Sequence, residues 1–112
     1  MKKFYRVCHR DTKQGLWYDQ QGRFTGLIHG DFDFCQHKGL EMHFDPEIQG
    51  YLSATDSLQD LFKWFPIEDI DRLQEHGYFV HVYESSEFKF YNRFQHLVIK
   101  QDSAKFLELI VL

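Results

Sequence analysis

A chain of 112 residues is the usual size of one folded domain, and we expect residues 1–112 to form a single domain. Hydrophobic residues make up 43% of the chain and aromatic residues 18%, which supplies enough apolar surface for a core and excludes an intrinsically disordered protein. The formal net charge of −4 offers no positive field to hold a phosphate backbone, so non-specific binding of DNA or RNA is disfavoured.

The sequence also indicates where the protein acts. It contains no run of about 18 apolar residues and no pattern of a secretory signal at its start, so we expect neither a membrane span nor export. Retention in the cell implies a reducing compartment, in which the two cysteines, Cys8 and Cys35, are expected to be free thiols. These features predict a cytoplasmic protein.

The first half of the chain is predicted to contain strands and one long loop. Residues 4–9 alternate between two faces as a strand requires. Residues 16–19 and 24–28 flank a glycine-containing turn and predict a hairpin. Residues 29–50 have no periodic pattern and predict a long loop with at most one helical turn. Because long loops in small domains are usually functional, this loop is the first candidate for a surface that contacts a partner.

Two short helices are predicted in the middle of the chain. Apolar residues recur at helical spacing over residues 58–65, and Thr55 or Asp56 is the expected N-cap. Pro66 suits the first position of a second helix, and Gly77 is expected to end it. The two helices are therefore predicted to meet just before the proline.

The last third of the chain is predicted to consist mainly of strands. Residues 78–83 and 95–100 are rich in aromatic and β-branched residues and are separated by a charged connector. The tail over residues 103–112 fits both a helix and a strand, and a helix is preferred. Together these elements predict the α+β class: a small, mostly antiparallel sheet with two short helices inserted in mid-chain.

Histidine and cysteine side chains invite two chemical interpretations. Four potential zinc ligands fall within fifteen positions of the long loop, namely His29, Cys35, His37 and His43. Their spacing matches no paired pattern of a zinc finger or ribbon, so no metal site is predicted. A nucleophilic pair of Cys8 with His9 is disfavoured because neighbours in a strand point to opposite faces, and Cys8 is interpreted as a small core residue. The motifs of P-loop proteins, dinucleotide-binding folds and serine hydrolases are absent from the sequence.

Arg6 is the most unusual residue of the first predicted strand. Burying a guanidinium in a sheet is costly unless a carboxylate or a phosphate receives it. We interpret Arg6 as one partner of an internal salt bridge, with contact to a ligand as the alternative. Aromatic residues could stack on a base or a nicotinamide ring, but core packing is the preferred interpretation for most of Trp17, Tyr18, Trp64, Tyr78 and Tyr83.

Four segments resemble a family of small bacteriophage proteins, and they comprise residues 5–7, 16–18, 53–65 and 77–83. The most specific part is the run Ser-Leu-x-x-Leu-x-x-Trp-Phe, which begins at Ser57 and is followed by a strand of aromatic residues after a glycine. The resemblance extends to about Lys100. It brings no assigned function with it, but it implies that the protein acts in an infected bacterium.

The order of the elements is also similar, more distantly, to a minimal ADP-ribosyltransferase fold. That fold has a first strand bearing Arg or His, a small polar strand that feeds a helix, and a later strand that begins with a catalytic acid. The resemblance implies that these places are taken by Arg6 or His9, by Ser53 with Thr55, and by Gln95. A neutral Gln95 neither stabilises developing positive charge nor activates an acceptor well, so a non-enzymatic use of the fold is at least as well supported as catalysis.

The first hypothesis for function is therefore a non-enzymatic phage accessory protein that binds and inhibits a host protein, for instance one of a defence system. Its contact surface would be the long loop, where acidic residues steer a basic target and aromatic residues anchor it. The residues expected to make this contact are Asp31, Phe32, Asp33, Phe34, Glu41, Phe44 and Asp45. This hypothesis requires no cofactor.

The alternative hypothesis is binding, sequestration or transfer chemistry on NAD or an ADP-ribose-like nucleotide in a cleft beside the first strand. The ligand-binding residues would then be Arg6, His9, Tyr51, Ser53, Thr55, Tyr83 and Gln95. A third interpretation is a small assembly subunit whose apolar tail, ending at Leu112, forms a dimer face. The sequence leaves the oligomeric state open.

Overall fold

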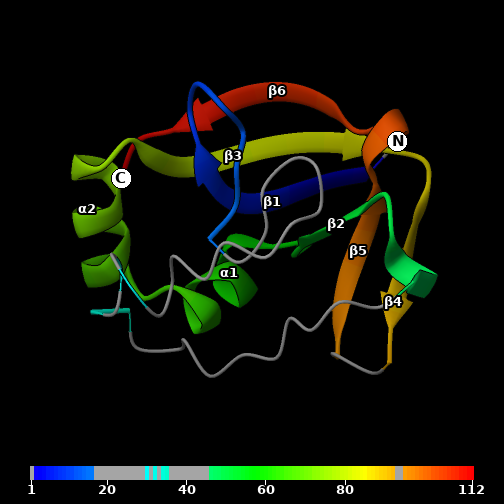
Figure 1. The fold of residues 1–112 in the computed structure, drawn as a ribbon, viewed down its shortest axis with the longest axis horizontal. Coiled ribbons are helices and arrows are strands. Elements are labelled where there is room, and N and C mark those ends of the chain that lie inside the picture. The colour runs from blue at the N-terminus through cyan, green and yellow to red at the C-terminus, as the bar shows by residue number, and fades with distance from the viewer. Residues whose placement is uncertain (1, 17–29, 31, 33, 36–45, 93–94) are drawn as a thin grey trace.

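A computed structural model describes residues 2–16, 30, 32, 34–35, 46–92 and 95–112. These residues form two antiparallel three-stranded sheets and two α-helices (Figure 1). The helices lie in mid-chain between strands of the two sheets. The predicted α+β class is therefore confirmed. The predicted hairpin over residues 16–28 lies outside the described residues except for Leu16, and so does most of the predicted loop over residues 29–50.

The first sheet has the strand order β1-β3-β6, formed by β1 (Lys2–His9), β3 (Tyr78–Ser85) and β6 (Lys105–Ile110). The central strand β3 pairs antiparallel with both neighbours. In this register Arg6 lies opposite His81, and Tyr83 lies opposite Phe106. The strands predicted over residues 4–9 and 78–83 are confirmed. Each is longer in the structure than in the sequence pattern, because cross-strand pairing extends over charged residues at the strand ends.

The second sheet has the order β2-β5-β4, formed by β2 (Tyr51–Ala54), β5 (His96–Lys100) and β4 (Phe88–Tyr91). Strands β4 and β5 run across the direction of β1, β3 and β6 (Figure 1). The strand predicted over residues 95–100 is confirmed, whereas β4 was missed because it lies within the charged connector. A 3-10 turn over Pro46–Ile48 precedes β2.

An isolated backbone bridge joins the two sheets. The N–H group of Tyr5 donates to the carbonyl of Thr55 at 2.8 Å, and the N–H group of Thr55 donates to the carbonyl of Tyr5 at 2.9 Å. The bridge ties the middle of β1 to the residue that follows β2. Because backbone pairs of this kind fix both position and direction, the bridge sets where side chains of β1 meet those of β2.

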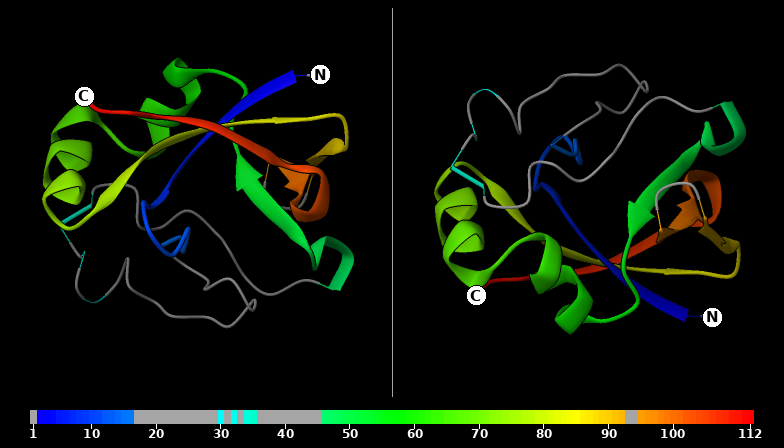
Figure 2. Two further views of the ribbon diagram at one scale, coloured as in Figure 1. Left: turned by 90° about the horizontal axis from the view of Figure 1, so that it is seen from above. Right: turned by 90° about the horizontal axis from the view of Figure 1, so that it is seen from below.

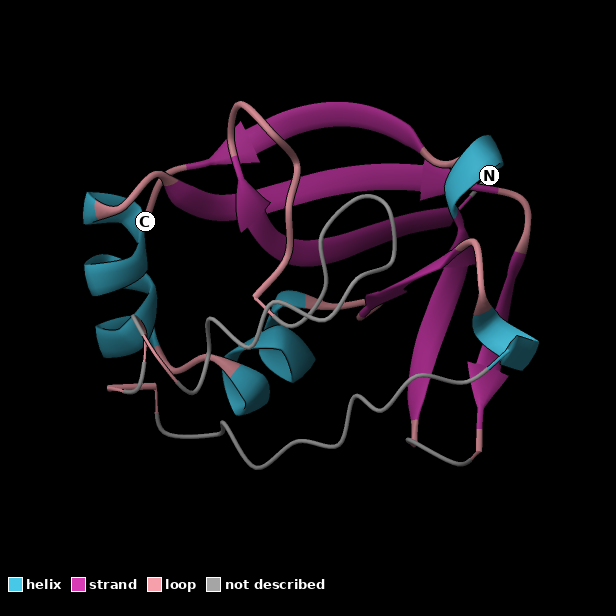
Figure 3. Cartoon of the chain, viewed as in Figure 1, coloured by secondary structure: helices cyan, strands magenta, loops and turns pink. Residues whose placement is uncertain are grey.

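The helices are α1 (Leu58–Trp64) and α2 (Ile67–Glu75), as predicted, and they lie below and beside the first sheet in the view of Figure 3. The N-cap of α1 is Ser57, whose hydroxyl accepts from the N–H group of Asp60 at 3.1 Å. The predicted caps were wrong because both residues have other partners. Thr55 belongs to the bridge between the sheets, and Asp56 pairs with Lys2 at 3.1 Å. Pro66 is the N-cap of α2 rather than its first residue.

The core is divided between the two faces of the first sheet. One face packs against the helices through Val7 and Val80, which meet Leu61, Ile70 and Leu73, all of them buried. At its other face the sheet meets the second sheet in a smaller cluster formed by Phe4, Ala54, Tyr83 and Ile99. The first sheet is therefore covered on both faces over part of its length, and Phe4 lies on the face that meets the second sheet.

The tail is a strand, so the preferred prediction of a helix was wrong. Residues Gln101–Ser103 form a 3-10 turn, and β6 then pairs with β3. Ser103 does not cap an α-helix, since its hydroxyl donates to the carbonyl of Lys100 at 3.2 Å and lies 2.9 Å from the hydroxyl of Ser85. The open backbone edge of β3 decided the outcome, because pairing along that edge outweighs the weak helix propensity of a short segment.

The chain beyond β6 remains extended because α2 holds it. The side-chain amide of Gln74 accepts from the N–H group of Leu112 at 2.8 Å and donates to the carbonyl of Leu112 at 3.0 Å. Figure 2 shows α2 and the C-terminus together at one end of the molecule, far from the N-terminus. These two hydrogen bonds keep the two residues after β6 extended in the direction of the strand.

Gly77 ends α2 as predicted, with φ of 85° and its N–H group donating to the carbonyl of Gln74 at 3.1 Å. A Cβ atom here would lie 2.8 Å from Nε2 of His9, whose ring is fixed because Nδ1 accepts from the N–H group of Asp11. We expect Gly77→Ala to destabilise the protein by about 2–3 kcal/mol, from the left-handed backbone and from displacement of the ring.

Gly50 is the matched control for this prediction, because its φ is 83° but no atom lies within 4 Å of an added Cβ. Gly50→Ala is expected to cost about 1 kcal/mol, from the backbone conformation alone. Urea denaturation of both variants measures the difference. Equal losses of stability would show that the approach to His9 has no energetic consequence.

Candidate functional site

The candidate site lies where β1 meets β2 and is built around Arg6. The guanidinium Nη1 donates to the carbonyl oxygen of Ser53 at 3.4 Å, and Nε is buried without a hydrogen-bond partner. Within the described part of the chain no carboxylate pairs with Arg6, so the predicted internal salt bridge is not formed there. The bridge between Tyr5 and Thr55 explains the position of Arg6, because it places the next residue of β1 beside β2.

Ser53 and His96 extend the site along the second sheet. The hydroxyl of Ser53 lies 3.0 Å from Nε2 of His96, which is buried, and the imidazole packs edge-on against Trp64 with ring centroids 5.1 Å apart. This separation is within reach of a nucleophile and its base. Thr55, the other residue implied at this place, donates its hydroxyl to the carbonyl of Ser57 at 2.9 Å, toward α1.

His81 is the residue that the sequence interpretation missed. It lies opposite Arg6 in the register and has no exposed surface. Its Nδ1 lies 2.9 Å from the carbonyl oxygen of Phe79, and because a carbonyl can only accept, Nδ1 carries the proton. Nε2 therefore presents a lone pair, which is buried without a partner. Burial lowers the pKa of His81 to about 4; the hydrogen bond to Phe79 opposes this shift, and the nearby charges of Lys13 and Arg6 add to it.

Cys8 and Tyr83 complete the surroundings of Arg6 and are both neutral at pH 7. Burial raises the pKa of the Cys8 thiol above its ordinary value, although the positive charge of Arg6 opposes the shift. Burial is also the largest cause of the raised pKa of Tyr83. A thiol with a raised pKa is a poor nucleophile. Cys8 therefore acts as a packing residue, as predicted, and both cysteines are buried free thiols.

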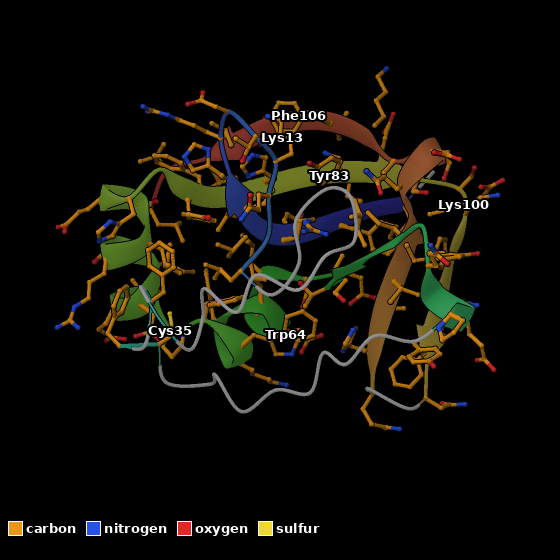
Figure 4. The ribbon with its side chains drawn as sticks, in the orientation of Figure 1. Lys13, Cys35, Trp64, Tyr83, Lys100 and Phe106 are labelled. Carbon is orange, nitrogen blue, oxygen red and sulfur yellow. The ribbon has the colours of Figure 1, made fainter. Side chains whose placement is uncertain are left out.

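A basic side chain approaches the same face of the first sheet from the turn after β1. The ammonium of Lys13 lies 4.2 Å from the ring centroid of Phe106 on β6 and donates to the carbonyl of Arg10 at 2.9 Å. Figure 4 shows Lys13 next to Phe106, with Tyr83 further along β3. The ring of Phe106 also lies 5.3 Å from that of His81. Lys13, Phe106 and His81 are thus neighbours.

Three other residues predicted for a nucleotide cleft lie elsewhere. His9 is the last residue of β1, where Nδ1 accepts from the N–H groups of Asp11 and Thr12 in the following turn at 3.1 and 3.4 Å. Tyr51 has the ammonium of Lys89 4.8 Å from its ring centroid. Gln95 is exposed in the turn before β5, with φ of 56°, and donates to the carbonyl of Asn92. In the described part of the chain no recorded contact joins these three to Arg6.

Two of the residues predicted for the partner contact, Phe32 and Phe34, are described, and both pack in or against the core. Phe32 is buried and packs against Tyr78 with ring centroids 5.1 Å apart. Phe34 is half-buried beneath the guanidinium of Arg72, 5.3 Å from its ring centroid. Phe32 is therefore a core residue. The other residues predicted for this contact, Asp31, Asp33, Glu41, Phe44 and Asp45, lie outside the described residues.

Neither a membrane span nor a metal cluster is found among the described residues. No described helix is long and apolar enough to cross a bilayer. No group of three His, Cys, Asp or Glu side chains is arranged to hold a metal ion within the same residues. Three of the four potential zinc ligands, His29, His37 and His43, lie outside them.

The fold and the site define a small two-sheet α+β protein with a buried cationic centre, and comparison with known families places it in a bacteriophage protein family. The family model that matches residues 1–111 is described as Bacteriophage T4 Y00F protein, and the chain belongs to this family. The predicted resemblance to small phage proteins is thereby confirmed. No curated protein and no solved structure matches the chain. The distant resemblance to ADP-ribosyltransferases has no support from these comparisons.

Proposed function

We propose that this phage protein acts by binding and inhibiting a protein of the infected bacterium, and that the edge strand β6 makes the contact. One observation carries the proposal: among the described strands β6 pairs with β3 alone, and it presents apolar side chains outward. The exposed fractions are 39% for Phe106 and 37% for Leu109 on β6, and 71% for Val111 just beyond its end. An edge with open backbone groups and exposed apolar side chains is a template for a further strand.

The occupant that fits this edge is an extended segment of the host protein. Backbone pairing along β6 would supply affinity, and side chains of the added segment would alternate between its two faces. Lys105 begins the strand and Lys13 lies against Phe106, so acidic residues in the host segment would be favoured there. The two hydrogen bonds between Gln74 and Leu112 hold this edge extended before binding, which lowers the entropic cost of association.

The proposal keeps the predicted kind of partner but changes the surface. The long loop remains a predicted contact through its acidic residues, while Phe32 belongs to the core. The predicted alternative, binding of NAD or an ADP-ribose-like nucleotide, stays a prediction. Of its residues, Arg6 and Ser53 are in contact, which is the observation that favours a ligand at this place.

The test compares capture of host proteins by the wild type and by two variants. Leu109→Glu and Val111→Glu place charge on the exposed edge and are expected to weaken binding of the specific partner at least tenfold, because the added carboxylates must be desolvated. Ile67→Glu is the control, since Ile67 is 50% exposed on α2. With the partner purified, amide hydrogen exchange is expected to slow over residues 105–110, and the partner's own activity is expected to fall.

Two results would overturn the proposal. One is a captured protein that binds all three variants equally and leaves exchange over β6 unchanged, because the contact would then lie elsewhere. The other is a measured mass of twice 13.6 kDa for the wild type that reverts to one chain in Leu109→Glu. In that case a second copy of the chain would occupy the edge.

A further inference from the structure

We infer that Arg6 and His81 together bind a phosphate group that carries a proton, either free hydrogen phosphate or a phosphomonoester. This inference does not depend on the proposed contact of β6 with a host protein. Arg6 and His81 lie opposite each other on paired antiparallel strands, so their side chains leave the sheet on the same side. Arg6 Nε and His81 Nε2 are the two buried side-chain polar atoms without a hydrogen-bond partner in the described part of the chain.

The two unpartnered atoms have opposite requirements. Nε of Arg6 is a donor and needs an acceptor. Nε2 of His81 is an acceptor and needs a donor, because the proton of the ring is on Nδ1, facing the carbonyl of Phe79. Each atom left unsatisfied costs about 1–3 kcal/mol. One group that accepts and donates through adjacent atoms would satisfy both, as the oxygen and the hydroxyl of a hydrogen phosphate do.

The charge around the pair favours an anion. Arg6 is permanently charged, and Lys13 is close enough to affect the titration of His81. Cys8 and Tyr83 border Arg6 but are neutral at pH 7, so neither serves as a counter-ion. On β6, the residues opposite His81 and Tyr83 are Leu109 and Phe106, which are uncharged. The charged residues next to them in sequence, Glu108 and Lys105, lie opposite Val82 and Glu84 instead. The described neighbours of the pair therefore add positive charge and no negative charge.

The turn after β1 brings a positive charge close to the pair. Figure 1 shows this turn rising past β3 and β6, and it carries Lys13. It is held by the N–H group of Lys13, which donates to the carbonyl of His9 at 2.8 Å, and by that of His9, which donates to the carbonyl of Gln14 at 2.9 Å.

The requirement for a proton separates phosphate from similar anions. Sulfate has the same shape but no proton at pH 7, so it can accept from Arg6 but leaves His81 Nε2 unsatisfied. The pyrophosphate of ADP-ribose likewise has no ionisable hydroxyl near pH 7. A phosphomonoester loses its second proton with a pKa near 6. We therefore expect a phosphomonoester to bind more strongly at pH 6 than at pH 8.

The decisive experiment is a titration of the wild-type protein with inorganic phosphate, glycerol phosphate, sulfate and ADP-ribose, followed through the ring nitrogens of His81 by NMR. Phosphate and glycerol phosphate are expected to shift the Nε2 resonance, and sulfate and ADP-ribose to bind at least tenfold more weakly. Saturation with sulfate at the same concentrations as phosphate would overturn the inference, as would a Nε2 resonance that no anion moves.

Substitutions of Arg6 and His81 test whether these two residues form the phosphate site. Arg6→Gln is expected to weaken phosphate binding at least tenfold, and Arg72→Gln, which removes an exposed guanidinium from α2, is expected to leave it unchanged. His81→Phe removes the acceptor, and we expect it to abolish the preference for phosphate over sulfate. If either site variant fails to fold, the NMR titration of the wild type decides alone. Unaltered phosphate affinity in a folded Arg6→Gln variant would contradict the assignment.

Discussion

Acidification from pH 6.5 to pH 4 is expected to lower the free energy of unfolding by about 3 kcal/mol through His81 alone. Burial holds the folded-state pKa of His81 at about 4, below its ordinary value of 6.5. Between these two values the unfolded chain binds a proton that the folded chain does not bind. The contribution of His81 to the free energy of unfolding is therefore fully present above pH 6.5. It decreases as the pH is lowered and stops changing below pH 4.

Urea denaturation at a series of pH values measures this effect. In His81→Phe the decline between pH 6.5 and pH 4 should be smaller by about 3 kcal/mol than in the wild type, because the variant has no group to titrate. His76→Gln is the control, since it removes an exposed histidine next to α2 and should keep the decline. If the free energy of unfolding of His81→Phe falls as steeply between pH 6.5 and pH 4 as that of the wild type, the acid sensitivity comes from other groups.

Phe4→Ala is expected to cost about 3–5 kcal/mol of stability, the largest effect of a single substitution that we predict. Phe4 has no exposed surface, and its ring lies 5.0 Å from that of Phe88 on β4. It packs with Ala54 and Ile99 of the second sheet from a position on the first, so its loss leaves a cavity between two sheets that the bridge at Tyr5 holds in place.

Phe90→Ala provides the matched comparison, because Phe90 is also on β4 but is 53% exposed. Its expected cost is within about 0.5 kcal/mol. Thermal and urea unfolding of both variants measure the difference. A loss below about 1 kcal/mol for Phe4→Ala would mean that the two sheets do not depend on this contact.

The elements that could be predicted are those whose pattern is local. Residues 4–9 and 78–83 combine alternation with β-branched and aromatic residues, and the helices have apolar stripes and a proline between them. Strand β4 could not be predicted in the same way. It has four residues, of which only Tyr91 is buried, and it exists because β5 offers an edge to it. The tail is a similar case, since its state depends on β3.

The candidate site shows the same division. Arg6 could be identified because a guanidinium within a strand needs a partner wherever the strand lies. His81 could not, because within an aromatic strand it has the pattern of a packing residue, and its importance depends on a cross-strand register that brings it opposite Arg6. The residues implied by element order were only partly brought together. Ser53 contacts Arg6, whereas Gln95 lies in a turn.

The strand order of the first sheet has a consequence for synthesis of the chain on the ribosome. The earliest strand to emerge, β1, pairs with β3, and the last strand, β6, completes the same sheet. At about 5–20 residues per second, β1 waits several seconds for its partner. During that interval Phe4, Val7 and Cys8 have no sheet to bury them. The nascent chain therefore gains its stable structure late, when it is nearly complete, and a truncated product would expose these residues to proteases and chaperones.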